Sequence, residues 1–149
     1  MTAKISTGGV VAMLDTPGLA SALEASDGCE LRIYAGAVPA SADAAIGSAT
    51  VLCKIKKDGT TPLNLEISGG VLAKPVADTW SATVLTSGVA SFFRLVRIPD
   101  DDSLSTSAVR IQGSVAQVGG DVNLMNTSLV ASTPQDIKEF IIGIAEAAV

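Results

Sequence analysis

Apolar residues alternate with polar or small ones in short runs separated by turn residues, a pattern typical of β-strands. The longest run covers residues 87–98 and is apolar on both sides when alternate positions are assigned to opposite faces. One face would hold Val89, Ser91, Phe93, Leu95 and Arg97, and the other Ala90, Phe92, Arg94, Val96 and Ile98. A strand that is apolar on both faces belongs in the middle of a fold, so we expect the other strands to pack around it.

Shorter runs predict further strands on both sides of this central one. They cover residues 30–34, 49–56, 63–67, 71–73, 78–85, 108–115 and 121–126. Turn signals separate them, including Asp58-Gly59 and Gly119-Gly120. Residues 35–48 are mostly small and nearly uncharged, and they include the helix and strand breakers Gly36, Pro39 and Gly47, so we expect a surface excursion there. The pattern as a whole predicts a mainly β protein.

The N-terminal segment has a different pattern. It predicts short helices over residues 8–14 and 19–25, interrupted at Pro17-Gly18 because proline disfavours helix at the preceding residue. We therefore divide the chain into an N-terminal helical or arm segment, residues 1–28, and a β domain, residues 29–149. The alternative for the first segment is an arm that becomes ordered only against another subunit.

The C-terminal stretch is compatible with two structures. Thr133-Pro134 is typical of a helix start, with threonine as the cap and proline at the first helical position. Alternating apolar residues and β-branched isoleucines favour a strand over residues 137–144 instead. We favour the strand.

Charge and composition narrow the possible partners. The net charge is -5 and the ten basic residues are scattered, which argues against nucleic-acid binding. No apolar run approaches the roughly 20 residues that span a bilayer, and the start of the chain lacks a signal-peptide pattern. We expect a soluble protein, made in the cytoplasm, without nucleic-acid or membrane partners.

Few residues are suited to catalysis or metal binding. The sequence has no histidine, which removes Ser-His-Asp and Cys-His sites and leaves zinc short of its usual ligands. Cys29 and Cys53 are expected to be free, partly buried thiols, with a disulfide as the alternative. Neither Gly69-Gly70 nor Gly119-Gly120 belongs to a nucleotide-binding pattern. We therefore predict no catalytic, cofactor-binding or metal-binding residues.

Three adjacent carboxylates, Asp100, Asp101 and Asp102, follow the central strand. A calcium loop of the EF-hand type needs alternate oxygen ligands, a glycine and a closing glutamate, none of which is present here. We expect a solvated hairpin turn. An enzyme using these carboxylates with Asp121 or Glu139 is the weakest functional hypothesis, since no spacing implies a cleft.

The remaining candidates are core or interface residues. The aromatic side chains Trp80, Phe92, Phe93 and Phe140 are expected in the core because they offer the largest apolar area. Arg94 and Arg97 lie in an otherwise apolar strand, so each needs an acceptor at its tip, either inside the sheet or across an interface.

Several motifs together resemble a family of small virion proteins of tailed bacteriophages. They are LRIYAGAVP followed by Ser41-Ala42-Asp43, then VLCKI at 51–55, GVASFFR at 88–94, IQGSV at 111–115 and GDVNL at 120–124. The family pattern has these segments in the same order, over about residues 30–144. This sequence departs at Ser91-Phe92, where the family often has Thr-Trp, and the pattern says little about the N-terminal segment.

The resemblance implies an antiparallel, jelly-roll-like β-sandwich that forms a homo-oligomer, a dimer or trimer. It implies a capsid cement or decoration protein on the virion surface, with the major capsid protein as its partner. A tail or baseplate component is the alternative.

Overall fold

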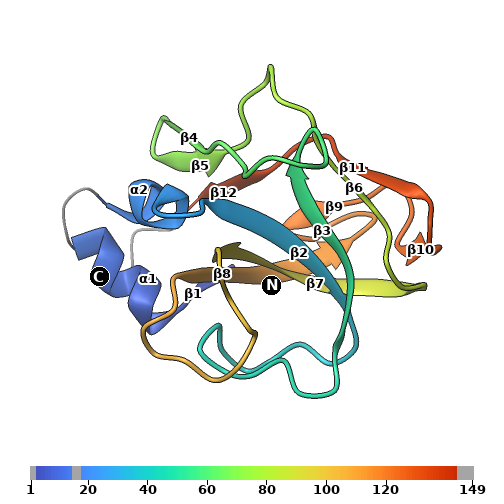
Figure 1. Ribbon diagram of the computed structural model, residues 1–149, viewed down its shortest axis with the longest axis horizontal. Helices are drawn as coiled ribbons and strands as arrows, with labels where there is room; N and C mark the ends of the chain where they lie inside the picture. Colours follow the sequence, from blue (N-terminus) through green and yellow to red (C-terminus); the bar gives the residue numbers. More distant parts are fainter. Residues whose placement is uncertain (1–2, 15–17, 144–149) are drawn as a thin grey trace.

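The computed structural model describes residues 3–14 and 18–143, and there the chain is mainly β (Figure 1). The elements are β1 (Lys4–Ile5), α1 (Thr7–Leu14), α2 (Leu19–Glu24), β2 (Cys29–Ala35), β3 (Thr50–Lys57), β4 (Glu66–Ser68), β5 (Val71–Ala73), β6 (Trp80–Thr83), β7 (Gly88–Arg97), β8 (Arg110–Ala116), β9 (Val122–Asn123), β10 (Ser128–Leu129), β11 (Pro134–Ile137) and β12 (Ile141–Gly143). The predicted β class and the two short N-terminal helices are confirmed.

The strands form two sheets. The larger has nine strands, in the order β1-β8-β7-β2-β3-β6-β11, with β10 added to β7 and β9 to β8. The smaller has three strands, in the order β12-β5-β4. All pairs are antiparallel except the short β8–β9 pair. Over the described residues the larger sheet does not close into a barrel.

The longest strand, β7, lies between β2 and β8, as its two apolar faces predicted. Phe93 and Leu95 point into the hydrophobic core, whereas Phe92, although buried, lies outside that cluster. The predicted alternation fails at one place. Tyr34 pairs with Phe92 but Ala35 pairs with Ala90, so the residue between them bulges and Ala90 joins the core face.

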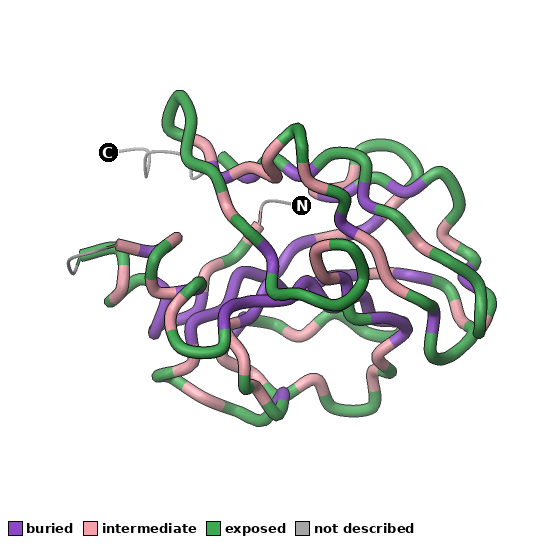
Figure 2. The backbone as a smooth tube through the Cα atoms, turned by 45° about the horizontal axis from the view of Figure 1, so that its top comes forward, coloured by how far each residue is buried: buried purple, intermediate pink, exposed green. Residues whose placement is uncertain are grey.

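The core lies between the two sheets and is rich in aromatic contacts. The ring centroids of Trp80 and Phe140 are 5.4 Å apart, and those of Phe93 and Phe140 are 5.7 Å apart, edge to face. Leu72 and Ile142 of the smaller sheet complete the same cluster. Figure 2 shows the buried residues concentrated on the central strands and the exposed ones on the loops and hairpins.

Two of the predicted strands are shorter than expected, and a third contains a bulge. Of the predicted strand 63–67, only residues 66 and 67 lie in a strand, β4, and Ile67 is exposed. In β3, Ile33 faces Cys53 but Tyr34 faces Val51, so a bulge turns Leu52 into the core beside Cys53. The predicted strand 121–126 is reduced to β9, because its pairing with β8 ends after two residues.

The first and the last described segments both pack on these sheets. β1 pairs with β8, and Leu19 and Leu23 of α2 are buried, so the described part of the N-terminal segment packs on its own chain. Near the C-terminus the strand hypothesis is confirmed over the helix, as β11 and β12 with a break between them. Residue 144, the last of the predicted strand, lies outside the described residues.

We predict that Phe93→Ala lowers the free energy of unfolding by about 3–5 kcal/mol, because it leaves a cavity where two aromatic rings meet. Val89→Ala, in the same strand at a 60% exposed position, is the matched control and should change it by less than about 0.5 kcal/mol. Urea denaturation of the three proteins measures both values. If both variants lost the same free energy of unfolding, the assignment of Phe93 to the core and of Val89 to the surface would be contradicted.

Candidate functional site

The face of the larger sheet that points away from the hydrophobic core carries charged side chains. Cross-strand pairing places them in three rows over β2, β7 and β8. The rows are Glu30-Val96-Arg110, Arg32-Arg94-Gln112 and Tyr34-Phe92-Ser114. Alternation along each strand puts all nine side chains on one face. A face with this much charge is normally solvated, yet here eight of the nine residues are buried.

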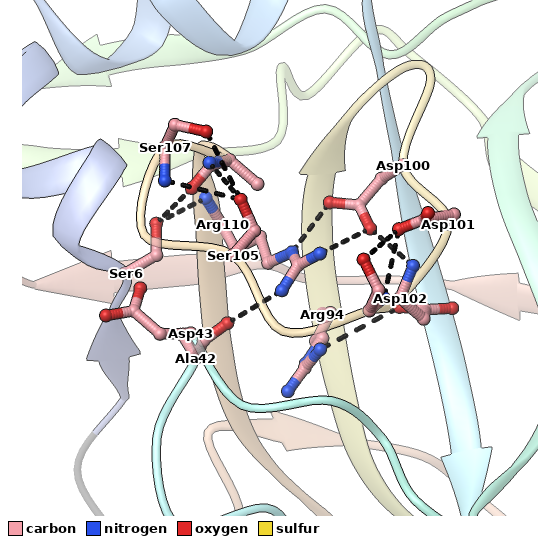
Figure 3. A network of polar contacts seen from close by, with 12 residues as sticks. Ser6, Ala42, Asp43, Arg94, Asp100, Asp101, Asp102, Ser105, Ser107 and Arg110 are labelled. Carbon is pink, nitrogen blue, oxygen red and sulfur yellow. Dashed lines mark hydrogen bonds and ion pairs between the residues drawn. The ribbon is translucent and has the colours of Figure 1, made fainter.

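Two loops cover this face, residues 36–49 and residues 98–109, both seen below the central strands in Figure 1. The second loop is attached by Asp100, which accepts two hydrogen bonds from Arg110, Nε to Oδ2 at 2.6 Å and Nη2 to Oδ1 at 2.8 Å (Figure 3). Both side chains of this pair are at most 2% exposed. A buried bidentate pair of this kind holds the loop in one orientation.

Asp102 attaches the same loop at a second point. Its carboxylate accepts a hydrogen bond from Arg32 Nη1 at 2.9 Å and another from the Tyr34 hydroxyl at 2.7 Å. Arg32 also donates to Glu30 at 2.7 Å. The φ of Asp102 is 63°, a left-handed conformation that aspartate tolerates better than most residues.

The first loop is held through its backbone carbonyls. Arg94 Nη2 donates to the Ala44 carbonyl at 2.7 Å, and Arg110 Nη1 donates to that of Ala42 at 3.2 Å. Gln112 accepts a hydrogen bond from Arg94 Nε and donates one to the Pro39 carbonyl. These contacts fasten a glycine- and alanine-rich loop that has few large apolar side chains of its own.

Arg94 is the most enclosed charged group of the network, with no exposed side-chain area. Its Nη1 lies 3.8 Å from Asp102 Oδ1, an ion pair beyond hydrogen-bond distance, and has no hydrogen-bond partner among the described residues. Burial lowers the pKa of the Arg94 guanidinium. Keeping the Arg94 side chain charged therefore costs more free energy than keeping any other group of the network charged.

Burial and neighbouring charges also shift the pKa of Tyr34 and the pKa of Arg32. Burial and the neighbouring Asp102 carboxylate raise the pKa of Tyr34 above its usual value, so its hydroxyl stays a donor. Burial opposes the charge on Arg32, but its hydrogen bond to Glu30 and the nearby carboxylates raise the pKa of Arg32 overall. The three buried arginines face three carboxylates, Glu30, Asp100 and Asp102, and Lys56 adds a further cation 3.7 Å from Glu30.

The solvated turn predicted for the three aspartates is therefore wrong for two of them. Asp100 and Asp102 are buried ion-pair partners. Asp101 alone is exposed, and its carboxylate accepts a hydrogen bond from the backbone N–H of Ser103. The excursion predicted for residues 35–48 is a loop, but it covers charged side chains and buries Ala42. Turn composition signalled the loops, whereas their role depends on arginines in distant strands.

The candidate residues separate into three environments. Trp80, Phe93 and Phe140 lie in the core, and Trp80 Nε1 has no hydrogen-bond partner among the described residues. Phe92 stacks on Tyr34 on the charged face, with ring centroids 4.6 Å apart and an interplanar angle of 3°. Arg94 belongs to the network. Arg97 is half-buried and makes no ion pair with any described residue.

Both cysteines are buried and unbonded, which confirms the prediction of free thiols. Cys53 faces Ile33, four positions along β2 from Cys29, a separation of roughly 13 Å that no disulfide can span. Burial raises the pKa of Cys53 to about 12, and burial with nearby Glu24 and Glu30 raises that of Cys29 to about 12.

Helix α1 presents an unusual surface. Its buried residues are Gly8 and Gly9, and a Cβ on Gly8 would lie 2.4 Å from the Ser107 carbonyl oxygen. The large side chains point outward instead and are between 40% and 86% exposed: Val10, Val11, Met13 and Leu14. Only glycine permits this close approach, so the helix is held with its apolar side chains in solvent.

Among residues 3–14 and 18–143, no cluster of cysteine and acidic side chains could hold a metal ion. Over the same ranges, neither helix has the length and hydropathy to cross a bilayer.

Comparisons of this chain with protein-family models, with curated proteins and with solved structures found no match.

We predict that Arg94→Ala lowers the free energy of unfolding by about 3–5 kcal/mol, because it leaves Gln112 Oε1 and the carbonyls of Ser41 and Ala44 without their donor and removes a positive charge near Asp102. Arg97→Ala, three positions along the same strand, is the matched control and should cost less than about 1 kcal/mol. Chemical denaturation gives both values. A stable Arg94→Ala variant would show that the network contributes little.

The two buried thiols should make the free energy of unfolding depend on pH in the alkaline range. Their pKa is raised from 9.0 to about 12, so the unfolded chain loses these protons first. The contribution of the two thiols to the free energy of unfolding is fully present below pH 9. It falls as the pH rises from 9 towards 12. Denaturation between pH 7 and 11 measures the slope, and a Cys29→Ala/Cys53→Ala variant should have a shallower one. Identical slopes would contradict the assignment.

Proposed function

We propose that this protein is a structural virion protein of a tailed bacteriophage. Its role would be that of a capsid cement protein, which bridges major capsid protein subunits on the shell surface and stabilises them. The resemblance of the sequence motifs to small virion proteins indicates this class of protein. Helix α1 supplies the observation that carries the proposal, because four exposed apolar side chains on eight residues are suited to an apolar partner surface.

The energetics are compatible with decoration of a shell. Covering the exposed part of each α1 side chain contributes roughly 1 kcal/mol, so a single helix binds weakly. Many copies on one shell multiply the effect, and a protein that contacts two capsid subunits at once gains further from effective concentration. The charge network supports this role, since clamped loops give a rigid body that transmits force between subunits.

The finer fold assignment belongs to the same proposal. We propose that the two sheets form a jelly-roll-like β-sandwich, supported by the single core to which both contribute. The proposed oligomer is a dimer or trimer, and the proposed location is the outer surface of the capsid.

We predict that purified virions of the encoding phage contain this protein in a copy number that fits the icosahedral shell. Particles that lack it should open at a lower temperature. Quantitative mass spectrometry and thermal release of DNA measure the two quantities. A copy number of only a few, with heads of normal stability, would contradict the capsid assignment and favour the tail or baseplate.

The α1 surface has its own test within the same system. Leu14→Asp should reduce binding of added protein to particles that lack it, because a charge replaces the most exposed apolar side chain of the helix. Met125→Asp, at an equally exposed apolar position outside α1, is the control and should bind normally. Equal binding of both variants would show that α1 is not the contact.

A further inference from the structure

Helix α1 has little tendency to form on its own. It has eight residues, and two of them are glycines and two are valines, which favour helix less than alanine or leucine does. An isolated helix of this length is unstable in water, so its structure depends on contacts with the rest of the chain. Gly8 and Gly9 are its buried residues, so the first turn is where the helix meets the body of the protein.

Ser6 joins this turn to β8 and to the covering loop of residues 98–109. Its hydroxyl accepts hydrogen bonds from the backbone N–H groups of Gly9, at 3.0 Å, and Arg110, at 2.8 Å. The same hydroxyl donates to the carbonyl of Ala108, in the loop, at 2.7 Å. Ser6 thus caps the helix and fixes it to one covering loop.

Asp43 holds the same turn from the other covering loop, residues 36–49. Its carboxylate accepts hydrogen bonds from the backbone N–H of Thr7, at 2.7 Å, and from the Thr7 hydroxyl. Thr7 is the first residue of α1, where the N–H groups have no partner inside the helix and a negative charge is favourable. The backbone carbonyl of Asp43 accepts a further hydrogen bond from the N–H of Ser105, in the loop of residues 98–109, at 2.9 Å.

The charge network holds the backbone on both sides of Asp43. Arg110 donates to the carbonyl of Ala42 at 3.2 Å, and Arg94 donates to that of Ala44 at 2.7 Å. Figure 3 shows Asp43 next to Ala42, which Arg110 contacts. The buried arginines therefore set the position of the loop from which the Asp43 carboxylate reaches α1.

We propose that Asp43 is a positioning residue for the binding surface on α1. It fastens the first turn of the helix to a loop that the buried arginines hold, so the exposed apolar side chains of α1 have one fixed orientation. A surface that is ordered before it binds loses less conformational entropy when its partner arrives. The proposal rests on the proposed function only in taking α1 as the contact surface.

Amide hydrogen exchange of the purified protein, followed by NMR, tests the link without any virion. The N–H of Gly9 bonds to Ser6 Oγ and that of Val10 to the Ser6 carbonyl, so both amides report on the first turn. Asp43→Ala should speed the exchange of both about tenfold or more and leave exchange in β7 unchanged. Asp43→Asn keeps an oxygen that can accept the Thr7 N–H, and should stay within about threefold of the original rates.

Asp101→Ala is the matched control. Asp101 also accepts hydrogen bonds from the N–H and hydroxyl of one residue, Ser103, but both lie in the same loop, so exchange in α1 should not change. Thr7→Val removes only the hydroxyl contact at an exposed position, and it should speed exchange of the first turn about threefold or more even if Asp43→Ala fails to fold.

Binding to particles that lack the protein separates positioning from a general effect on stability. Asp43→Ala keeps every apolar side chain of α1, yet it should weaken binding about fivefold or more. Asp43→Asn should recover binding to within about twofold, and Asp101→Ala should bind normally. Unchanged exchange in Asp43→Ala and Thr7→Val, or faster exchange with unchanged binding, would overturn the proposal. If the unaltered protein does not bind, the proposed function fails, whereas the exchange rates still decide whether Asp43 holds α1.

Discussion

The structure depends on the burial of three arginines and three carboxylates between the larger sheet and two loops. Charges on a buried face are tolerated only when they are paired and hydrogen-bonded. Here the loops supply part of the pairing, through Asp100 and Asp102 from one and the carbonyls of Ala42 and Ala44 from the other. The sheet and the loops are therefore stable only together, and loops with little apolar area acquire a fixed position.

The two faces of the larger sheet therefore have different roles. The inner face packs on Trp80, Phe140 and the smaller sheet, so hydrophobic burial supplies most of the stability there. The charged face contributes less net free energy but more specificity, because only one arrangement of the loops satisfies every partner. Helix α1, with its exposed apolar side chains, lies outside both faces.

Local pattern predicted the fold class but not the charge network. Alternation over residues 87–98 located the central strand, and turn residues located the loops. The bulges at Ser91 and Leu52 were not predictable, because they arise from the register of neighbouring strands. By local sequence criteria, the three aspartates predict a solvated turn. Only the pairing of β7 with β8 brings Arg110 beside Asp100. One signal was available, since Arg32, Arg94 and Arg110 each lie in an apolar strand and each needs a nearby acceptor.

A double-mutant cycle on Asp100 and Arg110 tests the central claim most directly. The free energies of unfolding of Asp100→Ala, Arg110→Ala and the double variant give the energy that couples the two side chains. If the pair holds the loop to the sheet, the coupling energy should exceed about 1.5 kcal/mol. Effects that add to within about 0.5 kcal/mol would contradict the claim, because the two groups would then act independently.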